Sequence, residues 1–229
     1  MALYCDMYKV SDQTKCILKN VCKDNKCGEM CMKCYKFYYY VNTSNLIKSY
    51  MKTEISGGEE DIDGNYYHAL LNIANDILNF INEGKNLVIC GDKPGSGKTF
   101  WATKIMQKYI YKMCIYNINE NLAIFVPEVE LLHQIERNRF NKGFEILDKY
   151  ENCNLLTIDD IGMFKKTDFQ QQELFRLIDY RVTHNKTTIF TSNFVTKAQY
   201  TEVLGERLCS RIYETSLIIE LKDDSRREF

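Results

Sequence analysis

The apolar residues of the chain follow two spacings in turn, and this alternation predicts the order of its elements. Between Tyr67 and Ile81 they recur every three or four residues, which predicts an amphipathic helix. Segments of helical length then separate short, continuous apolar runs, which are typical of strands buried on both faces of a parallel sheet. These runs are Asn86–Cys90, Leu122–Val126, Leu155–Ile158, Thr188–Thr191 and Leu217–Leu221. We therefore predict an α/β fold with a central parallel sheet flanked by helices.

The pattern changes near residue 66 and suggests a division of the chain. Residues 1–45 are polar and rich in cysteine, and they end in the aromatic run Phe37–Tyr40. The stretch Ser56–Asp61 is rich in glycine and acidic residues, as linkers often are. We predict a cysteine-rich module at 1–45, a linker at 46–65 and the α/β domain at 66–229.

Composition limits the classes of function. The chain has 229 residues, 45% of them hydrophobic, which is enough for a core without disulfides. Its 30 Lys and Arg residues nearly balance 31 Asp and Glu residues, so a contact with nucleic acid requires a local basic patch. No apolar run approaches the roughly 18 residues of a membrane span, and the first residues lack the pattern of a secretion signal. We expect a cytoplasmic protein with no membrane partner.

Six of the ten cysteines lie within the first 34 residues, and in a reducing compartment such a cluster indicates a metal site. Four of them are separated by four, three and two residues, which suits a tetrahedral zinc site: Cys22, Cys27, Cys31 and Cys34. Cys16 could replace Cys22, and Cys5 could contribute. An iron–sulfur cluster and unliganded thiols are the alternatives. The other cysteines have apolar neighbours and are predicted to be buried: Cys90, Cys114, Cys153 and Cys209.

A phosphate-binding loop follows the first predicted strand, at Gly91–Thr99, and leads into a helical segment. Backbone N–H groups in such a loop turn toward phosphates, and the helix directs its positive end at them. Lys98 would reach the β- and γ-phosphates, and the Thr99 hydroxyl would bind Mg²⁺. The residues that we assign to the nucleotide are Pro94, Gly95, Ser96, Gly97, Lys98 and Thr99. A glycine-rich turn with an incidental lysine is the alternative.

The loop departs from the usual pattern at one position. A glycine normally stands five places before Gly97, but this chain has Asp92 there, and Gly91 comes one place too early. A carboxylate near phosphates repels them, so Asp92 is expected to weaken nucleotide binding.

Polar side chains end two further predicted strands. Asp159 and Asp160 follow the run that ends at Ile158. Asp159 would hold Mg²⁺, and Asp160 would deprotonate the attacking water, which is the role of the base in a hydrolase. Asn193 ends the next run, where its amide could contact the γ-phosphate or hold that water. A solvated acidic turn and an asparagine turn are the alternatives.

Charged residues elsewhere suggest contacts with partners. Arg207 and Arg211 lie four residues apart on one helical face, where one could reach a neighbouring subunit's γ-phosphate or both could be surface charges. Lys165 and Lys166 follow the paired acids, beside Phe164 and Phe169. Lysines next to aromatic rings suit phosphate contact and base stacking with single-stranded DNA, although a solvated lysine pair is an equal alternative.

Together these residues resemble those of the AAA+ helicase loaders of the DnaC/DnaI type and the related IstB transposase helpers. The resemblance covers roughly residues 65–229, and its most specific parts are Asp159–Gly162, Thr191–Asn193 and Leu204–Arg207 with Arg211. It implies an AAA+ P-loop NTPase fold, with a small zinc-binding module before it as in loaders of the DnaI kind. The roles implied are Walker A for Lys98 and Thr99, Walker B for Asp159 and Asp160, sensor I for Asn193, the arginine finger for Arg211 and sensor II for Arg227.

The resemblance implies an ATP-dependent loader that places a hexameric replicative helicase on single-stranded DNA when replication begins. The zinc module would hold the helicase, the protein would self-associate through Arg211 in the ATP state, and a weak or partner-stimulated ATPase would drive release. Three alternatives stay open: a transposase helper of the IstB kind, a small-molecule P-loop kinase, and a weakly catalytic ATP-dependent adaptor. The abundance of Lys, Asn, Ile and Tyr, which have A/T-rich codons, suggests a low-GC bacterium or its phage.

Overall fold

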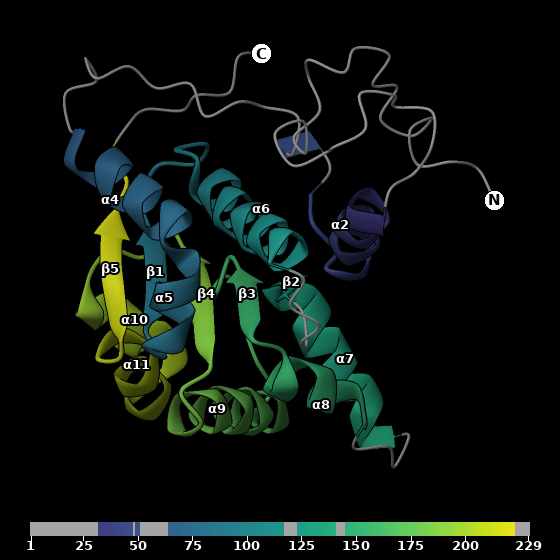
Figure 1. Ribbon diagram of the computed structural model, residues 1–229. Coiled ribbons are helices and arrows are strands. Elements are labelled where there is room, and N and C mark those ends of the chain that lie inside the picture. Colours follow the sequence, from purple (N-terminus) through teal and green to yellow (C-terminus); the bar gives the residue numbers. More distant parts are fainter. Residues whose placement is uncertain (1–31, 48, 51–63, 117–122, 141–144, 223–229) are drawn as a thin grey trace.

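A parallel sheet organises the part of the chain that the computed structural model describes, residues 32–47, 49–50, 64–116, 123–140 and 145–222 (Figure 1). Within these residues five strands lie in the order β2-β3-β4-β1-β5, and every neighbouring pair is parallel. The strands are β1 (Asn86–Cys90), β2 (Ala123–Pro127), β3 (Leu155–Asp159), β4 (Thr187–Ser192) and β5 (Ser216–Glu220). The predicted parallel sheet is confirmed, with each strand at its apolar run. The predicted zinc-binding module lies largely outside the described residues.

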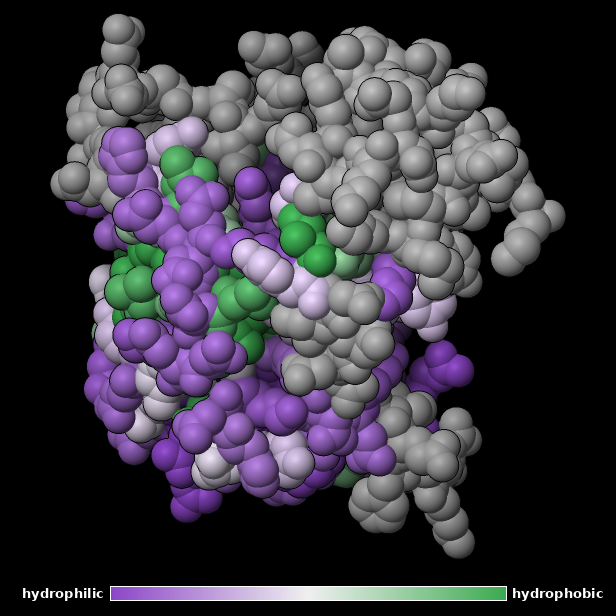
Figure 2. All heavy atoms as spheres, viewed as in Figure 1, coloured by the Kyte–Doolittle hydropathy of each residue, from purple (hydrophilic) through white to green (hydrophobic). Residues whose placement is uncertain are grey.

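Helices connect the strands and cover both faces of the sheet. They are α2 (Met32–Thr43), α4 (Gly64–Asn75), α5 (Ile77–Asn82), α6 (Lys98–Ile115), α7 (Glu128–Phe140), α8 (Glu145–Asn152), α9 (Asp168–Thr183), α10 (Lys197–Leu204) and α11 (Glu206–Tyr213). No helix in the described ranges is long and apolar enough to span a membrane. Figure 2 shows that most of the described surface on one face is hydrophilic, with apolar side chains in a few patches.

The helix predicted across residues 67–81 is divided in two at Asp76. The ψ angle of Asp76 is +28°, outside the helical range, and α5 begins at the next residue. The Asn79 side-chain amide donates to both carboxylate oxygens of Asp76, at 2.9 and 3.1 Å. Aspartate commonly forms such local hydrogen bonds, which compete with a continuous helix.

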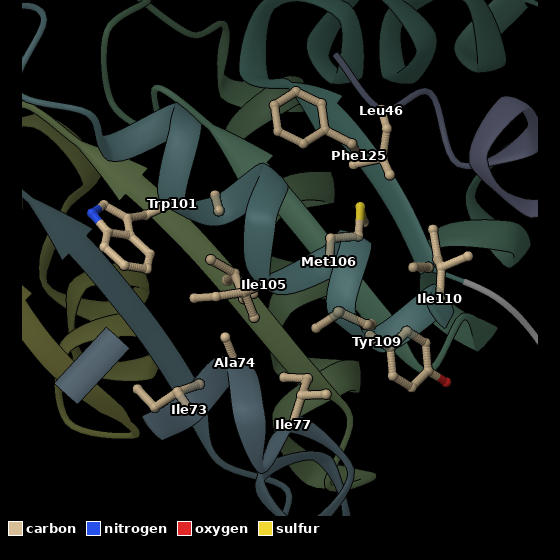
Figure 3. Packing of buried hydrophobic residues seen from close by; sticks show 14 of the residues in the cluster. Leu46, Ile73, Ala74, Ile77, Trp101, Ile105, Met106, Tyr109, Ile110 and Phe125 are labelled. Atoms are coloured by element: carbon tan, nitrogen blue, oxygen red, sulfur yellow. The ribbon is translucent and has the colours of Figure 1, made fainter. Parts of the chain in front are cut away.

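The two faces of the sheet carry separate apolar clusters because side chains alternate along each strand. In β1, Leu87 and Ile89 join the cluster formed with α2, α4, α5 and α6, whereas Val88 and Cys90 join the cluster formed with α7 to α11. Figure 3 shows the first cluster, in which α6 places Ile105 against the apolar side chains of α4 and α5. Burial on both faces explains why the strands read as continuous apolar runs.

Helix α2 belongs to this same core. Its Phe37 and Val41 are buried against α6, and Leu46, which follows the helix, is 5% exposed. The backbone N–H of Phe125 on β2 donates to the carbonyl of Ser44 at 2.8 Å. Part of the segment that we assigned to the cysteine-rich module therefore packs on the sheet domain. The boundary at residue 45 stays a prediction, because residues 1–31 lie outside the described part of the chain.

Arg181, a fully buried residue of α9, joins the amino ends of two strands. Its guanidinium donates to the backbone carbonyls of Tyr150, Cys153 and Thr187, at 2.6, 2.9 and 2.6 Å, and to the Thr188 hydroxyl at 2.9 Å. These acceptors are neutral, and so is the buried Cys153 thiol, whose sulfur lies 3.5 Å from the same guanidinium. The guanidinium therefore serves as a multiple hydrogen-bond donor that links the end of α8 to the start of β4.

We predict that Arg181→Met lowers the free energy of unfolding by about 3 kcal/mol or more, because it leaves buried carbonyls without donors. Arg176→Met is the control: Arg176 lies on the same helix, and its side chain is 46% exposed in ion pairs with Glu151 and Glu173. That change should cost less than about 1 kcal/mol. Urea denaturation followed by circular dichroism measures the free energy of unfolding of both variants. Equal losses of stability would contradict the role of Arg181 as a structural hydrogen-bond donor.

Candidate nucleotide-binding site

The phosphate-binding loop lies between the end of β1 and the start of α6, as the sequence predicts. Gly97 precedes the first residue of α6 with a φ of +98°, a conformation that favours glycine. Ser96 is buried, Gly95 is half-buried and Pro94 is exposed. The loop therefore meets the amino end of an 18-residue helix, where free N–H groups attract anions.

Lys98 is folded onto its own loop. Its ammonium group donates to the carbonyls of Gly91 and Lys93, at 2.9 and 3.1 Å, and to the Ser96 hydroxyl at 3.3 Å. The residue is 6% exposed, and burial lowers the pKa of its ammonium, an effect that the nearby Asp160 carboxylate opposes. The ammonium thus points into the loop that would receive the phosphates.

The carboxylate of Asp159, the predicted Walker B acid, lies beside the hydroxyl of Thr99, from the predicted Walker A motif. The Thr99 hydroxyl donates to Oδ1 of Asp159 at 3.0 Å, although the two residues are 60 positions apart in the chain. The same carboxylate oxygen accepts a hydrogen bond from the Thr191 hydroxyl at 2.6 Å. Burial raises the pKa of the Asp159 carboxyl, and the hydrogen bond from Thr191 opposes this rise. The hydroxyl and carboxylate oxygens are hard donors that fit Mg²⁺, and their role as its ligands stays a prediction.

Asp160 follows β3 in a strained conformation. Its φ is +56°, in the left-handed region that residues with a side chain rarely adopt. Its backbone N–H donates to the Thr191 hydroxyl at 2.8 Å, and the next N–H, of Ile161, donates to the Thr191 carbonyl at 2.9 Å. This turn directs the chain away from the sheet at the position predicted for the catalytic base.

Gly91, which comes one place before the usual glycine position of the loop, lies close to the backbone of a neighbouring segment. A Cβ atom at Gly91 would lie 2.6 Å from the carbonyl oxygen of Leu221, which follows β5, so a larger residue does not fit there. Asp92, the predicted irregularity, is exposed to solvent. Water therefore screens its carboxylate, and the repulsion of phosphates that we expected from Asp92 is reduced.

Asn193 lies immediately after β4, the strand between β1 and β3. Its side-chain amide donates to the sulfur of Met163 at 3.2 Å and remains partly exposed. This position is at the carboxyl end of the sheet, where ligands of such folds bind, and the role of Asn193 as a sensor stays a prediction.

Arg211, the predicted arginine finger, lies on α11 and is exposed. Its Nε forms an ion pair with Oδ1 of Asp179, a residue of α9, at 2.6 Å. Arg207 is also exposed, one turn earlier on the same helix. Arg227, the predicted sensor II residue, lies outside the described residues.

The structure separates the two lysines that we considered for DNA. Lys165 is exposed, but the Lys166 side chain is only 3% exposed and forms an ion pair with the buried carboxylate of Glu128, at 2.8 Å. The other Glu128 oxygen accepts from the Phe164 backbone N–H at 3.3 Å. The Lys166 ammonium is therefore buried in an ion pair and is not available to contact DNA in this structure. This half of the lysine-pair prediction is wrong.

Five of the six candidate zinc ligands lie outside the described residues. These are Cys5, Cys16, Cys22, Cys27 and Cys31, and only the backbone position of Cys34, within α2, is described. Within the described ranges, no group of three or more His, Cys, Asp or Glu side chains could hold a metal ion.

The four scattered cysteines are buried and free, as predicted: Cys90, Cys114, Cys153 and Cys209. Burial raises the thiol pKa of Cys90 and of Cys114 to about 11, so these thiols stay protonated and unreactive near neutral pH.

Three contacts near the predicted site residues escaped sequence reasoning: the bridge made by Thr191, the pairing of Asp179 with Arg211 and that of Glu128 with Lys166. Each joins residues that are far apart in the chain, so no local spacing signals it. Of the three partners that sequence reasoning missed, Asp179 and Glu128 lie outside every motif that we quoted, whereas Thr191 lies directly before Ser192 and Asn193, and its position at the end of a strand was a usable signal.

Known proteins are similar to this chain in sequence. The chain is 24% identical to the uncharacterized protein YqaM of Bacillus subtilis strain 168 over 212 residues, which are 84% of this chain and 66% of that protein. It is 25% identical to the replicative helicase loader DnaC of Escherichia coli strain K12 over 125 residues, or 54% of this chain and 49% of DnaC. The chain thus spans only about half the length of that loader.

Solved structures agree with the fold. A crystal structure of the DnaC helicase loader superimposes with a TM-score of 0.63 and 26% identity, over 77% of this chain and all of that one. DnaI superimposes with a TM-score of 0.60 at 22% identity, over 80% of this chain and 95% of that one, which supports the fold alone. Residues 68–228 match the family described as IstB-like ATP binding protein. This match covers more than half of the chain, which therefore belongs to the IstB-like ATP-binding family, with an AAA+ P-loop fold.

Proposed function

We propose that the protein is an ATPase that loads a hexameric replicative helicase onto single-stranded DNA. The observation that carries the ATPase part is the meeting of Lys98, Thr99, Asp159 and Asp160 at one edge of the sheet. The likeness to DnaC, in both sequence and structure, supports the loader part.

In this proposal the phosphates of ATP lie in the loop before α6, and Lys98 exchanges its carbonyl partners for the β- and γ-phosphate oxygens. Mg²⁺, held by Thr99 and Asp159, would supply positive charge that balances the phosphates. Asp160 accepts a proton from a water molecule whose oxygen then bonds to the γ-phosphorus. The bond from that phosphorus to the bridging oxygen of ADP breaks, which yields ADP and phosphate. Asn193 orients the water or contacts the γ-phosphate.

The remaining parts of the proposal concern partners. The module at residues 1–45 holds the helicase, with zinc bound by Cys22, Cys27, Cys31 and Cys34, or with Cys16 or Cys5 in the set. Single-stranded DNA binds weakly at the loop after the paired acids, where Lys165 and the ring of Phe164, which is 42% exposed, remain accessible. Arg211 completes the site of a neighbouring subunit, and Arg227 acts within its own subunit.

A transposase helper is the second candidate, because the family that the chain matches is described as IstB-like ATP binding protein. It would use the same ATP site and would bind an integrase rather than a helicase. A capture experiment separates the two candidates, whereas a hydrolysis assay separates both from a non-catalytic adaptor.

We predict that Asp160→Asn lowers the rate of ATP hydrolysis by about a hundredfold or more, because the amide cannot accept the proton of the attacking water. ATP binding should persist, since the substitution removes a negative charge near the phosphates. Phosphate release and binding of a fluorescent ATP analogue measure the two effects. Asp168→Asn, an exposed carboxylate in the first turn of α9, is the control. Equal rates in the two variants would remove Asp160 from the mechanism and favour the adaptor.

A second prediction concerns Arg211. If it completes a neighbour's site, hydrolysis per subunit should rise with protein concentration, and Arg211→Ala should abolish this rise while Arg207→Ala keeps it. Asp179→Asn frees the guanidinium and should shift the rise to lower concentration, by up to about fivefold for a half-exposed pair. A rise that persists in Arg211→Ala would exclude this arginine as the finger.

A third prediction tests the partner. The full-length protein, with ATP, should capture the replicative helicase of its host or phage, and the double variant Cys31→Ser, Cys34→Ser should lose both zinc and most of this capture. Cys209→Ser is the matched control, because Cys209 is buried and its sulfur already accepts a hydrogen bond from Thr201. Metal analysis and quantified capture are the measurements. Failure of capture with intact ATPase activity would favour the transposase helper.

A further inference from the structure

One hydroxyl group connects both Walker B acids. Thr191, on β4, is fully buried, and its Oγ1 donates to the Asp159 carboxylate at 2.6 Å while it accepts the backbone N–H of Asp160 at 2.8 Å. A hydroxyl has a single proton, so this donor is committed to Asp159. Thr191 therefore acts on neighbouring residues and has no proton left for a ligand.

The strand register makes this contact possible. In the parallel pair β3 and β4, Ile158 lies opposite Phe190, so the next residues of the two strands, Asp159 and Thr191, are neighbours. Side chains at alternate positions share a face, and both residues face α6, from which Thr99 reaches the same carboxylate oxygen. Asp159 Oδ1 thus accepts one hydroxyl from β4 and another from α6.

Thr191 also supports the strained backbone after β3. A left-handed φ at a residue other than glycine costs roughly 1–2 kcal/mol, so the surrounding structure must hold Asp160 in place. Thr191 does so twice: its hydroxyl accepts the N–H of Asp160, and its carbonyl accepts the N–H of Ile161 at 2.9 Å. The direction of the Asp160 side chain follows from this backbone geometry.

Other threonines of the sheet show that packing alone does not require such a contact. Thr157 on β3 and Thr187 on β4 are both fully buried, and neither hydroxyl has a hydrogen-bond partner within the described residues. At those positions threonine serves as a β-branched residue of the strand. At Thr191 the hydroxyl has two partners, and both belong to the Walker B acids.

We propose that Thr191 is a positioning residue, whose hydroxyl orients the Asp159 carboxylate toward the metal and fixes the backbone that aims Asp160 at the attacking water. This inference rests on the proposed ATPase function of the same site. It assigns the residue a role in the rate of hydrolysis and in the metal dependence of nucleotide binding, and none in direct contact with the nucleotide.

Three variants of the full-length protein test the proposal. Thr191→Val keeps the shape and removes the hydroxyl, Thr191→Ser keeps the hydroxyl, and Thr157→Val is the matched control, because it removes a buried hydroxyl without partners from the same sheet face. The measurements are kcat and KM for ATP, and the affinity for a fluorescent ATP analogue with and without Mg²⁺. Melting temperatures verify folding, and Thr191→Ala replaces the valine variant if that variant is unfolded.

We expect Thr191→Val to lower kcat about tenfold or more, the effect of one well-placed hydrogen bond, with KM nearly unchanged. It should also lose most of the tightening of nucleotide binding that Mg²⁺ causes, while binding without Mg²⁺ stays within about twofold of wild type. Thr191→Ser and Thr157→Val should both resemble the wild type.

Either of two results would overturn the proposal: wild-type kcat and wild-type Mg²⁺ dependence in Thr191→Val, or equal impairment of Thr191→Ser or Thr157→Val. A wild-type protein that hydrolyses no ATP, alone or with a helicase, would refute the proposed ATPase instead. In that case the Mg²⁺ dependence of analogue binding alone decides the role of Thr191, so the two failures remain distinguishable.

Discussion

Strand β4 is hydrogen-bonded on both sides to the strands that carry the phosphate-binding loop and the paired acids, and the site depends on this register. Cys90 of β1 lies opposite Ser192, and the N–H of Gly91 donates to the Ser192 carbonyl at 3.2 Å, where the loop begins. On the other side, Thr191 holds Asp159 and Asp160. A shift of one residue in the strand register would move every side chain of the shifted strand to the other face of the sheet. The observed register therefore keeps the loop that carries Lys98 next to the paired acids.

The sheet and the ends of its strands were predictable because they rest on local patterns. Continuous apolar runs identified all five strands, and glycines with a lysine before a helix identified the loop. The contacts that complete the site depend on distant residues: the sequence around Lys166 looks like a solvated pair, and only the fold brings Glu128 to it. The break at Asp76 also escaped prediction, since a single polar residue on an amphipathic helix does not interrupt its apolar spacing.

The match to the IstB-like family covers residues 68–228, which include the candidate nucleotide-binding site. Structures of DnaC and of domain III of DnaA from Thermotoga maritima superimpose with TM-scores of 0.63 and 0.60, although one is named a helicase loader and the other a replication initiation protein. The same fold therefore occurs in proteins with different names, so the role of this chain has to be argued from its own site and surface residues. In this chain the cysteine-rich residues before α2 are the part with the most distinctive composition.

The position of Lys98 has a consequence for the thermodynamics of ligand entry. Its ammonium already has three hydrogen-bond acceptors within the loop, so an incoming phosphate exchanges partners and adds no donor. The gain in binding free energy comes from replacing neutral acceptor oxygens by anionic ones. The attraction between the ammonium and these anionic oxygens is strengthened because Lys98 is buried. The Lys98 ammonium is therefore fully hydrogen-bonded before a ligand arrives, and its contribution to selectivity depends on the charge of the ligand rather than on the ligand's capacity to accept hydrogen bonds.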